Sequence, residues 1–393
     1  MGRPSALRLI QLGFLGIFFG VLVIPLIALD PDSEAVVWII EHRHAAALPA
    51  LPDSLASAEA WPAGFDAYLS DHFGGRPLLV RAFNGGRYRL FGEGASEQAV
   101  FGPTGRLYLT TNFADRPYSW IGQICGVGFD DASVDRGVSD LAAFGRRALT
   151  PPTDRYTMIV PTAPVLYPRD MPDWLQRACS GTSLVDRLLA RLPPSGLRDR
   201  PFYPLPELLA AERNDAVIPL TNFHWDGIGP ETAVAAFAEK VLGMQPLLIL
   251  PTRRVAKLSD IDGVIPGIAT ANAMTVPDYD AAGIDYCFGV PCFPELPEAG
   301  VIRDLSRLDS PAPGGRKLLI LSDSFGRNAV GWFAAYFHTV RHFSVSNLGR
   351  LSPAELADFR HFIYDDYQPD VVLYLFADGS ALYWPAFVAD LDL

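Results

Sequence analysis

The chain has little positive charge and few charged residues of either sign. Among its 393 residues, 32 are Lys or Arg and 44 are Asp or Glu, which gives a formal net charge of −12. Proteins that bind nucleic acid through phosphate contacts carry a basic patch or stripe, and this composition provides no such footprint. The electrostatic field of the whole protein would not attract a strongly anionic polymer either. Only a local basic groove could bind such a polymer.

Cysteine is also scarce, and the four present are Cys125, Cys179, Cys287 and Cys292. Such a small set fits disulfides in an oxidising compartment outside the cytoplasm. Cys287 and Cys292 can close a small loop, which would leave Cys125 and Cys179 as a second pair, although four cysteines allow three connectivities. A zinc site is disfavoured because four residues, rather than two, separate the last two cysteines and no His lies near them. We expect no metal and no cofactor.

Internal repeats and low-complexity segments are absent, and long charged runs do not occur. Hydrophobic residues make up 49% of the chain and charged residues 19%, so a large core can form and global disorder is excluded. The length suits one large or two modest domains.

A single long apolar run, Leu9–Leu29, lies near the N-terminus and contains one strongly polar residue, Gln11. Its 21 residues are enough to cross a bilayer. Basic residues precede the run and acidic residues follow it, which favours a cytoplasmic N-terminus. A cleaved signal peptide is the alternative, but no clear A-x-A site closes the run. We therefore expect residues 1–30 to be an uncleaved, single-pass transmembrane signal anchor.

The remainder divides into a juxtamembrane helical and linker region, residues 31–94, and an α/β domain, residues 95–393. Strand and helix patterns alternate in the second region, which indicates βαβ units and a parallel sheet flanked by helices. Met244–Gly314 is rich in Pro and Gly and fits an insertion. The predicted strands are Val100–Leu109, Tyr156–Pro161, Leu318–Leu321, His342–Val345 and Val371–Phe376. The predicted helices are Asp135–Ala148, Gly181–Leu192, Glu231–Leu242, Arg327–Thr339 and Pro353–Tyr367.

The stretch KLLILSDSFG, Lys317–Gly326, contains the first candidate catalytic residue. Its apolar run predicts a strand buried on both faces, and Ser324 follows this strand where a helix begins. Open α/β sheets bind ligands at the carboxyl ends of their strands, and N–H groups of a helix start can hold a developing oxyanion. Ser324 is therefore either a nucleophile or simply a helix cap.

A second stretch, LTNFHWDGIG at Leu220–Gly229, contains His224, which lies 100 residues before Ser324. A serine nucleophile needs a base to take its proton, and His is the usual one. Residues remote in sequence can meet in the fold, so this spacing neither supports nor forbids the pairing.

The two stretches together resemble the alginate O-acetyltransferase family of SGNH hydrolase-like proteins, in which the His element precedes the serine block. Three further segments are similar to segments of that family and extend the resemblance to roughly residues 60–380. They are WPAGFDAYLSDHFGGRPLLVRAFN at Trp61–Asn84, VFGPTGRLYL at Val100–Leu109 and IVPTAPVLYPRDMP at Ile159–Pro172.

The chain departs from the family at Asn222, because relatives carry Asp two residues before the His. Asn can orient the imidazole through one hydrogen bond but cannot stabilise the imidazolium by charge, and the equivalent change in serine proteases lowers turnover by about 10⁴. Three outcomes stay open: a Ser–His dyad, a replacement carboxylate such as Asp226, or lost catalysis. Asp323 and Trp225 are further candidates for supporting the site.

The resemblance implies an SGNH-like fold and an O-acetyltransferase that is held at the inner membrane and faces the periplasm. The implied reaction acetylates an exported polysaccharide through an acetyl-serine at Ser324. It also implies a membrane-bound acyltransferase as acetyl donor. A carbohydrate acetylesterase is the alternative enzyme, and a catalytically weak polysaccharide-binding subunit of a secretion complex is the alternative outside enzymes. Aromatic residues can stack on sugars but are more often core; the candidates are Trp225, Trp332, Tyr383 and Trp384.

Overall fold

The computed structural model describes residues 6–30, 33–34, 37, 44–94, 96, 98–111, 116–146, 153–192, 200–312 and 315–393. The chain forms two compact units. Unit 1 comprises residues 1–99, 111–117 and 261–269, and unit 2 comprises residues 100–110, 118–260 and 270–393. The chain passes from unit 1 to unit 2 after Ala99 and returns to unit 1 twice, at Thr111–Pro117 and Ile261–Ala269.

Unit 1 is helical, with α1 (Ala6–Ile27), α3 (Leu55–His72), α4 (Arg76–Phe91) and α12 (Ile261–Val264). Helix α3 begins with a capping box between Ser54 and Ser57. In α4, the Nδ2 group of Asn84 donates to the carbonyl oxygen of Pro266 at 3.0 Å, which joins α4 to the returning segment.

The predicted transmembrane anchor coincides largely with α1, which has 22 residues. In the part of the chain that the structure describes, no helix is both long and apolar enough to cross a membrane. The structure therefore does not support the predicted transmembrane helix.

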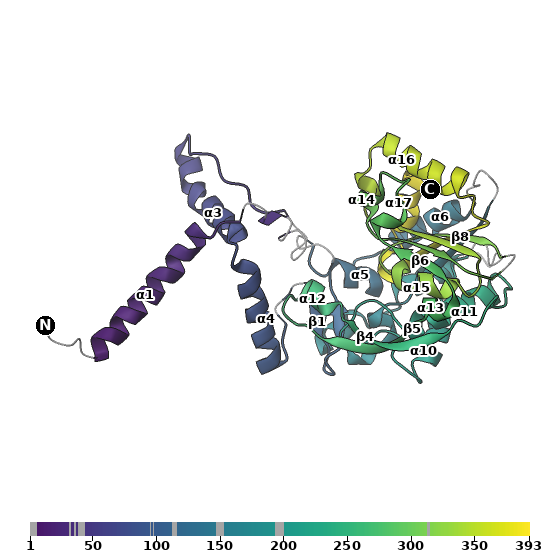
Figure 1. The fold of residues 1–393 in the computed structure, drawn as a ribbon, viewed down its shortest axis with the longest axis horizontal. Helices are drawn as coiled ribbons and strands as arrows, with labels where there is room; N and C mark the ends of the chain where they lie inside the picture. The colour runs from purple at the N-terminus through teal and green to yellow at the C-terminus, as the bar shows by residue number, and fades with distance from the viewer. Residues whose placement is uncertain are drawn as a thin grey trace. The chain divides into compact units, whose positions relative to one another are not determined.

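Unit 2 is built on a six-stranded sheet with the order β3-β10-β8-β9-β7-β6 (Figure 1). Four neighbouring strands are parallel, as predicted, and β7 and β6 continue the sheet in antiparallel pairing. The strands are β3 (Asp154–Val160), β10 (Val371–Ala377), β8 (Lys317–Ser322), β9 (Thr339–Ser344), β7 (Leu305–Asp309) and β6 (Asp285–Phe288).

The predicted insertion, Met244–Gly314, is more structured than its Pro and Gly content suggests. It supplies β7 and β6 to the main sheet and also forms an antiparallel ribbon of β4 (Thr252–Leu258) and β5 (Ala271–Pro277). The predicted strand Val100–Leu109 is instead two short paired strands, β1 (Ala99–Phe101) and β2 (Leu107–Leu109). Gly105, with a φ of 87°, lies in the turn between them.

Helices cover both faces of the main sheet (Figure 1). One face packs against α6 (Asp131–Arg146), α16 (Pro353–Arg360) and α17 (Trp384–Asp390), where Leu319 and Leu321 of β8 join a large buried apolar cluster. On the other face, Phe237 of α11 (Ile228–Lys240) contacts Tyr156 of β3 and Phe333 of α15 (Gly326–Phe333). Burial on both faces explains the unbroken apolar run of β8.

Shorter elements complete unit 2. The helices are α5 (Ser119–Cys125), α7 (Ala163–Leu166), α8 (Asp173–Ala178), α9 (Leu184–Arg191), α10 (Leu205–Ala211), α13 (Tyr279–Ala282) and α14 (Ala299–Ile302). The 3-10 turns are η1 (Pro168–Asp170), η2 (Val290–Cys292), η3 (Leu348–Arg350) and η5 (Asp378–Ser380), and η4 (His361–Asp366) is a π-helix.

Both predicted cysteine pairs are disulfides, Cys125–Cys179 and Cys287–Cys292. The first joins the end of α5 to the residue that follows α8. The second spans the turn from β6 into η2.

Candidate active site

Ser324 lies just beyond the carboxyl end of β8, at the edge of the sheet where the parallel strands end. It precedes α15, which begins at Gly326. A Cβ atom at Gly326 would meet the hydroxyl and Cβ of Ser322 at 2.0 and 2.5 Å, so this tight strand-to-helix turn requires glycine there. The half-buried Ser324 side chain is thus set at the position where open α/β sheets bind ligands.

His224 lies beside Ser324. Its Nε2 atom is 2.7 Å from the Ser324 Oγ, which is hydrogen-bonding distance for the transfer of the hydroxyl proton. The ring packs between Phe223 and Phe325, with centroid distances of 4.3 and 4.9 Å, and only 6% of the residue is exposed. The fold therefore brings together the two residues that sequence motifs identified separately.

A third residue, Asp260, was not predicted and completes the arrangement. Its Oδ2 atom is 3.0 Å from Nδ1 of His224. The same oxygen accepts the backbone N–H of His224 at 3.0 Å and that of Phe223 at 3.3 Å. By geometry, Ser324, His224 and Asp260 form a nucleophile–base–carboxylate triad.

The charge of Asp260 is maintained by its surroundings. Burial acts to raise the pKa of this carboxyl, but the positive charge and hydrogen bonds of His224 outweigh burial, and Arg327 adds to them, so the pKa lies below its usual range. An ionised carboxylate at this point can stabilise an imidazolium on His224.

Asn222, predicted to orient the imidazole, contacts the carboxylate residue instead. Its Oδ1 atom accepts the backbone N–H of Asp260 at 3.3 Å and the Nδ2 group of Asn272 at 3.1 Å. Thr221 adds a bond to the same Asn272 amide at 3.0 Å. Asn222 therefore fixes the chain at Asp260, because its side chain ties that residue to the start of β5.

Asp226, considered as a replacement carboxylate, does not contact the His224 ring. Its Oδ2 atom pairs with Nζ of Lys257 at 2.6 Å, and its Oδ1 atom accepts the N–H of Gly227 at 2.8 Å. The Lys257 amine also donates to Oδ1 of Asn328 at 3.2 Å. Asp226 thus links the histidine loop to the β4–β5 ribbon and to α15.

Trp225, considered as a sugar-stacking residue, is fully buried and joins the loop that carries His224 to the turn that carries Ser324. Its Nε1–H donates to the carbonyl of Phe325 at 2.8 Å, and its own carbonyl accepts from Asn328 at 2.8 Å. Trp332 and Trp384 are also buried, at 6% and 4% exposure. Of the four stacking candidates only Tyr383, 44% exposed, presents an accessible ring.

Asp323 supports the turn that carries Ser324. One carboxylate oxygen accepts the N–H of Phe325 at 3.0 Å, and the other accepts from Ala377 N–H at 2.8 Å and Ser380 Oγ at 3.2 Å. Burial raises the pKa of this carboxyl, and these hydrogen bonds oppose the effect. The bonds tie the nucleophile turn to the residues that follow β10.

Two of the N–H groups at the start of α15, considered as oxyanion donors, already have hydrogen-bond partners. The Phe325 N–H donates to the Asp323 side chain and the Gly326 N–H to the Asp323 carbonyl, at 3.0 and 3.2 Å. Within the described residues, the N–H of Ser324 itself makes no such bond, and it remains the candidate oxyanion donor of this turn.

A second buried carboxyl, Asp378, lies at the end of β10. It accepts the N–H and the hydroxyl of Thr162 at 2.9 and 2.7 Å. Burial raises the pKa of Asp378 to about 7, and the nearby charge of Asp323 adds to this rise. These bonds join the end of β10 to the segment after β3.

The carboxyl ends of the parallel strands in this mixed sheet lie beside a serine, a histidine and a carboxylate in hydrogen-bonding order. This is the geometry of a serine-dependent acyl-transfer site. No protein-family model matches the chain. No curated protein sequence matches it either.

Three solved structures illustrate what the fold is similar to. A DHHW family protein from Eubacterium siraeum is 17% identical, with a TM-score of 0.46 over 66% of this chain and 88% of that one. The O-acetyltransferase domain of Pseudomonas putida AlgJ is 16% identical, with a TM-score of 0.44 over 75% and 98%. Pseudomonas aeruginosa AlgX is 13% identical, with a TM-score of 0.39 over 76% and 65%. At such low identity and TM-score, these likenesses carry no argument about activity.

Proposed function

We propose that the protein is an O-acetyltransferase that moves an acetyl group onto hydroxyls of an exported polysaccharide through an acetyl-serine at Ser324. The observation that carries the proposal is the continuous contact from Ser324 Oγ to His224 Nε2 at 2.7 Å and from His224 Nδ1 to Asp260 at 3.0 Å. The ordered motifs of the alginate O-acetyltransferase family support the choice of acetyl as the group and polysaccharide as the acceptor.

The chemistry proceeds in two balanced steps. Ser324 Oγ attacks the acetyl carbonyl of the donor while His224 Nε2 takes the hydroxyl proton, and the donor leaves with that proton. A sugar hydroxyl then attacks the acetyl-serine, His224 takes its proton, and the serine hydroxyl is regenerated with the acetyl group on the sugar. Asp260 holds the Nδ1–H of the ring and stabilises the imidazolium in both steps.

This proposal includes a membrane-bound acyltransferase as the acetyl donor. It also places the protein at the inner membrane, with the catalytic unit in the periplasm. Two disulfides support an oxidising compartment. Mass analysis of the native N-terminus tests the retained anchor, because a mature chain that starts near Ala28–Asp32 would contradict it.

Single-turnover acetylation by p-nitrophenyl acetate, followed by intact mass, tests the mechanism. We expect a stable acetyl adduct on wild type and none on Ser324→Ala or His224→Ala, and the double variant should lose little more because the residues act as one unit. Acetylation of Ser324→Ala at the wild-type rate would disprove the nucleophile.

The carbohydrate acetylesterase is the second candidate, since water can resolve the same acetyl-serine. Adding oligosaccharide acceptors separates the two: an acetylated sugar product favours transfer, whereas free acetate alone favours hydrolysis. The binding-subunit alternative predicts no acetyl adduct at all, and the complete triad argues against it.

A further inference from the structure

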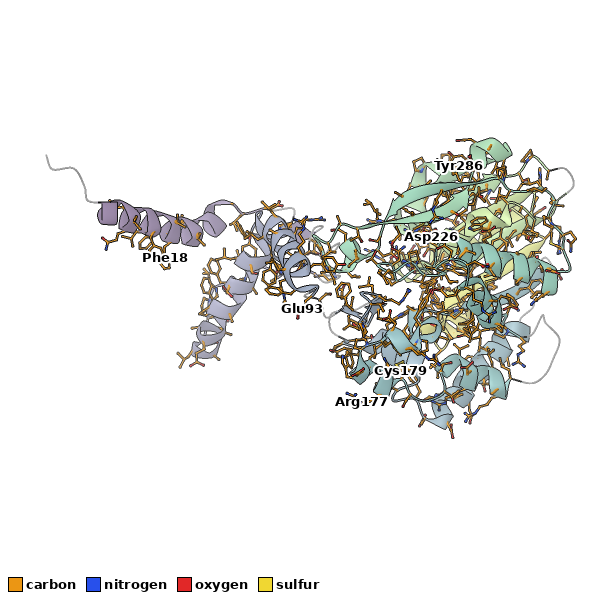
Figure 2. The ribbon with its side chains drawn as sticks, turned by 90° about the horizontal axis from the view of Figure 1, so that it is seen from below. Phe18, Glu93, Arg177, Cys179, Asp226 and Tyr286 are labelled. Carbon is orange, nitrogen blue, oxygen red and sulfur yellow. A yellow bond between two sulfur atoms is a disulfide. The ribbon has the colours of Figure 1, made fainter. Side chains whose placement is uncertain are left out.

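A second histidine, His342, lies close to the turn that carries Ser324 and takes no part in the chemistry described above. It is distinct from the catalytic His224, whose loop is marked by Asp226 in Figure 2. His342 lies on β9, and its side chain is fully buried. Its Nε2 atom is 2.8 Å from the Oγ atom of Ser322, the last residue of β8. Burying a polar ring is costly unless it is hydrogen-bonded, and this contact supplies the bond.

The hydrogen bonds of Ser322 determine which ring nitrogen of His342 carries the proton. The Ser322 hydroxyl donates to the carbonyl oxygen of Asp323 at 2.6 Å, which uses its one proton. The His342 Nε2 atom must therefore carry a hydrogen and donate to the same Oγ. The other nitrogen of a neutral imidazole, Nδ1, is then unprotonated, and within the described residues this buried atom has no partner.

The surroundings of His342 keep the ring neutral. Burial lowers the pKa of His342, the negative charge of Asp304 opposes this effect, and the positive charge of Arg327 adds to it. A protonated ring would place a second N–H at Nδ1, for which the described part of the chain offers no acceptor. The ring therefore serves as a fixed hydrogen-bond donor.

The carbonyl at the end of this chain of bonds belongs to the peptide group between Asp323 and Ser324. It accepts the Ser322 hydroxyl at 2.6 Å and the Gly326 N–H at 3.2 Å. Glycine permits this close approach, since a Cβ atom at residue 326 would lie 3.0 Å from the Nε2 atom of His342. A trans peptide group is planar, and its C=O and N–H point in opposite directions. Fixing the carbonyl therefore also fixes the direction of the Ser324 N–H, the candidate oxyanion donor.

We propose that His342 and Ser322 are positioning residues that orient the Ser324 N–H as the oxyanion donor of the acyl-transfer site. The inference rests on the proposed function and adds to it the residues that set this donor. Oxyanion donors are effective because they are fixed before the reaction begins. Hydrogen bonds in a chain also polarise one another, so the bond from His342 makes the Ser324 N–H a stronger donor.

Single-turnover acetylation of the full chain by p-nitrophenyl acetate tests the proposal. Ser322→Ala and His342→Leu should each lower the rate constant at saturating ester by roughly tenfold or more. The ester concentration that gives half the maximal rate should not change, because the oxyanion forms only after the ester has bound. The double variant should lose little more than either single variant, since the two residues act as one unit.

Two amide replacements separate the donating nitrogen of His342 from the bulk of its ring. The side-chain amide of Gln reaches about as far as Nε2 and can donate to Ser322, whereas that of Asn reaches only about as far as Nδ1. His342→Gln should therefore keep close to the wild-type rate, and His342→Asn should be as slow as His342→Leu. In urea unfolding, His342→Leu should be at least as stable as His342→Gln. Rates that follow these stabilities would assign packing alone to His342 and overturn the proposal.

The ester p-nitrophenyl thionoacetate, in which sulfur replaces the carbonyl oxygen, tests the oxyanion directly. Sulfur is a weak hydrogen-bond acceptor, so wild type should prefer the oxygen ester. This preference should fall in Ser322→Ala and in His342→Leu, because only the oxygen ester makes full use of the donor. An unchanged preference would overturn the proposal, since slower proton transfer to His224 would affect both esters equally.

Ser310→Ala is the matched control. Ser310 is 3% exposed and follows β7 at the opposite edge of the sheet, where Asp309 pairs with Thr339, the first residue of β9. Its hydroxyl oxygen accepts the Ala312 N–H at 3.4 Å. The control should leave both the acetylation rate and the ester preference unchanged.

Failure of this inference is distinguishable from failure of the proposed function. If wild type is acetylated and both Ser322→Ala and His342→Leu match its rate, the positioning role fails and the proposed function stands. If wild type forms no acetyl-serine, the proposed function fails and this inference fails with it. Ser322→Ala is the smaller change and decides the matter if His342→Leu does not fold.

Discussion

The Asp260 carboxylate holds His224 at two points, through ring Nδ1 at 3.0 Å and through the backbone N–H at 3.0 Å. The acid of the triad thus comes from a position 36 residues after the histidine, rather than two residues before it. Asn222, two residues before the histidine, accepts the backbone N–H of Asp260 at 3.3 Å through its Oδ1 atom. The substitution at residue 222 is therefore compatible with a complete triad.

Asp260→Asn should slow acetylation of Ser324 by up to about 10⁴, because an amide neither fixes the tautomer nor stabilises the imidazolium. Single-turnover mass kinetics with p-nitrophenyl acetate gives the rate. Asp262→Asn, which removes a nearby carboxylate that pairs with Arg81, is the control and should keep the rate. A wild-type rate for Asp260→Asn would exclude Asp260 from the mechanism.

Asn222→Asp should not raise the rate, although it places a carboxylate two residues before His224. The imidazole Nδ1 already has a carboxylate partner, and a second negative charge near Asp260 raises the pKa of that carboxyl by like-charge repulsion. The same single-turnover assay decides the matter. A clear acceleration would mean that Asp260 serves the ring poorly in solution.

Trp225→Phe should destabilise the protein by about 1–3 kcal/mol and slow acetylation, because the Phe325 carbonyl loses its buried donor. Urea unfolding and the acetylation assay measure the two effects. Trp384→Phe is the matched control, since its buried Nε1 makes no hydrogen bond within the described residues. Equal losses in both variants would assign the effect to ring packing alone.

Replacing Cys125 and Cys179 together by Ala should cost more stability than replacing Cys287 and Cys292. The sequence separations are 54 and 5, and loop-closure entropy gives about 4 and about 2 kcal/mol respectively. Urea unfolding of the two double variants under non-reducing conditions measures the difference. A larger loss for the short loop would show that native packing, rather than chain entropy, dominates.

Asp378 should make stability fall as the pH rises from about 4 to about 7. Its pKa is raised to about 7 in the folded chain, so in this window the folded protein retains a proton that the unfolded chain, with a pKa of about 3.9, releases. Asp323 acts in the same direction and Asp260 in the opposite one. Thermal unfolding of Asp378→Asn should therefore show a flatter pH dependence. Asp285→Asn, at an exposed ion pair, should not flatten it.

Much of unit 2 follows from local patterns in the sequence. All four parallel strands were predicted, and the apolar runs of β8 and β10 are the clearest signals, because these two strands are buried on both faces and need no alternation. Strands β3 and β9 also carry half-buried residues. The antiparallel extension by β7 and β6 was missed, since Pro and Gly punctuation within Met244–Gly314 was interpreted as an irregular insertion. Pairing with β9 outweighed those local breakers.

The sequence alone was enough to identify Ser324 and His224 as candidates, because each lies in a short segment whose chemistry is local. The serine lies at a strand-to-helix turn, and the histidine lies in a polar loop next to Trp225. Only the tertiary structure decided that Asp260, and neither Asn222 nor Asp226, meets the imidazole. Asp260 follows β4. The Ser259 hydroxyl donates to the Thr270 carbonyl, and the Asn272 amide donates to Asn222 Oδ1, so Asp260 is held where the ribbon meets the histidine loop. The physical reason is that a hydrogen bond depends on the distance between two atoms in space. Here the pairing of β4 with β5 sets that distance, and the number of residues between Asp260 and His224 does not.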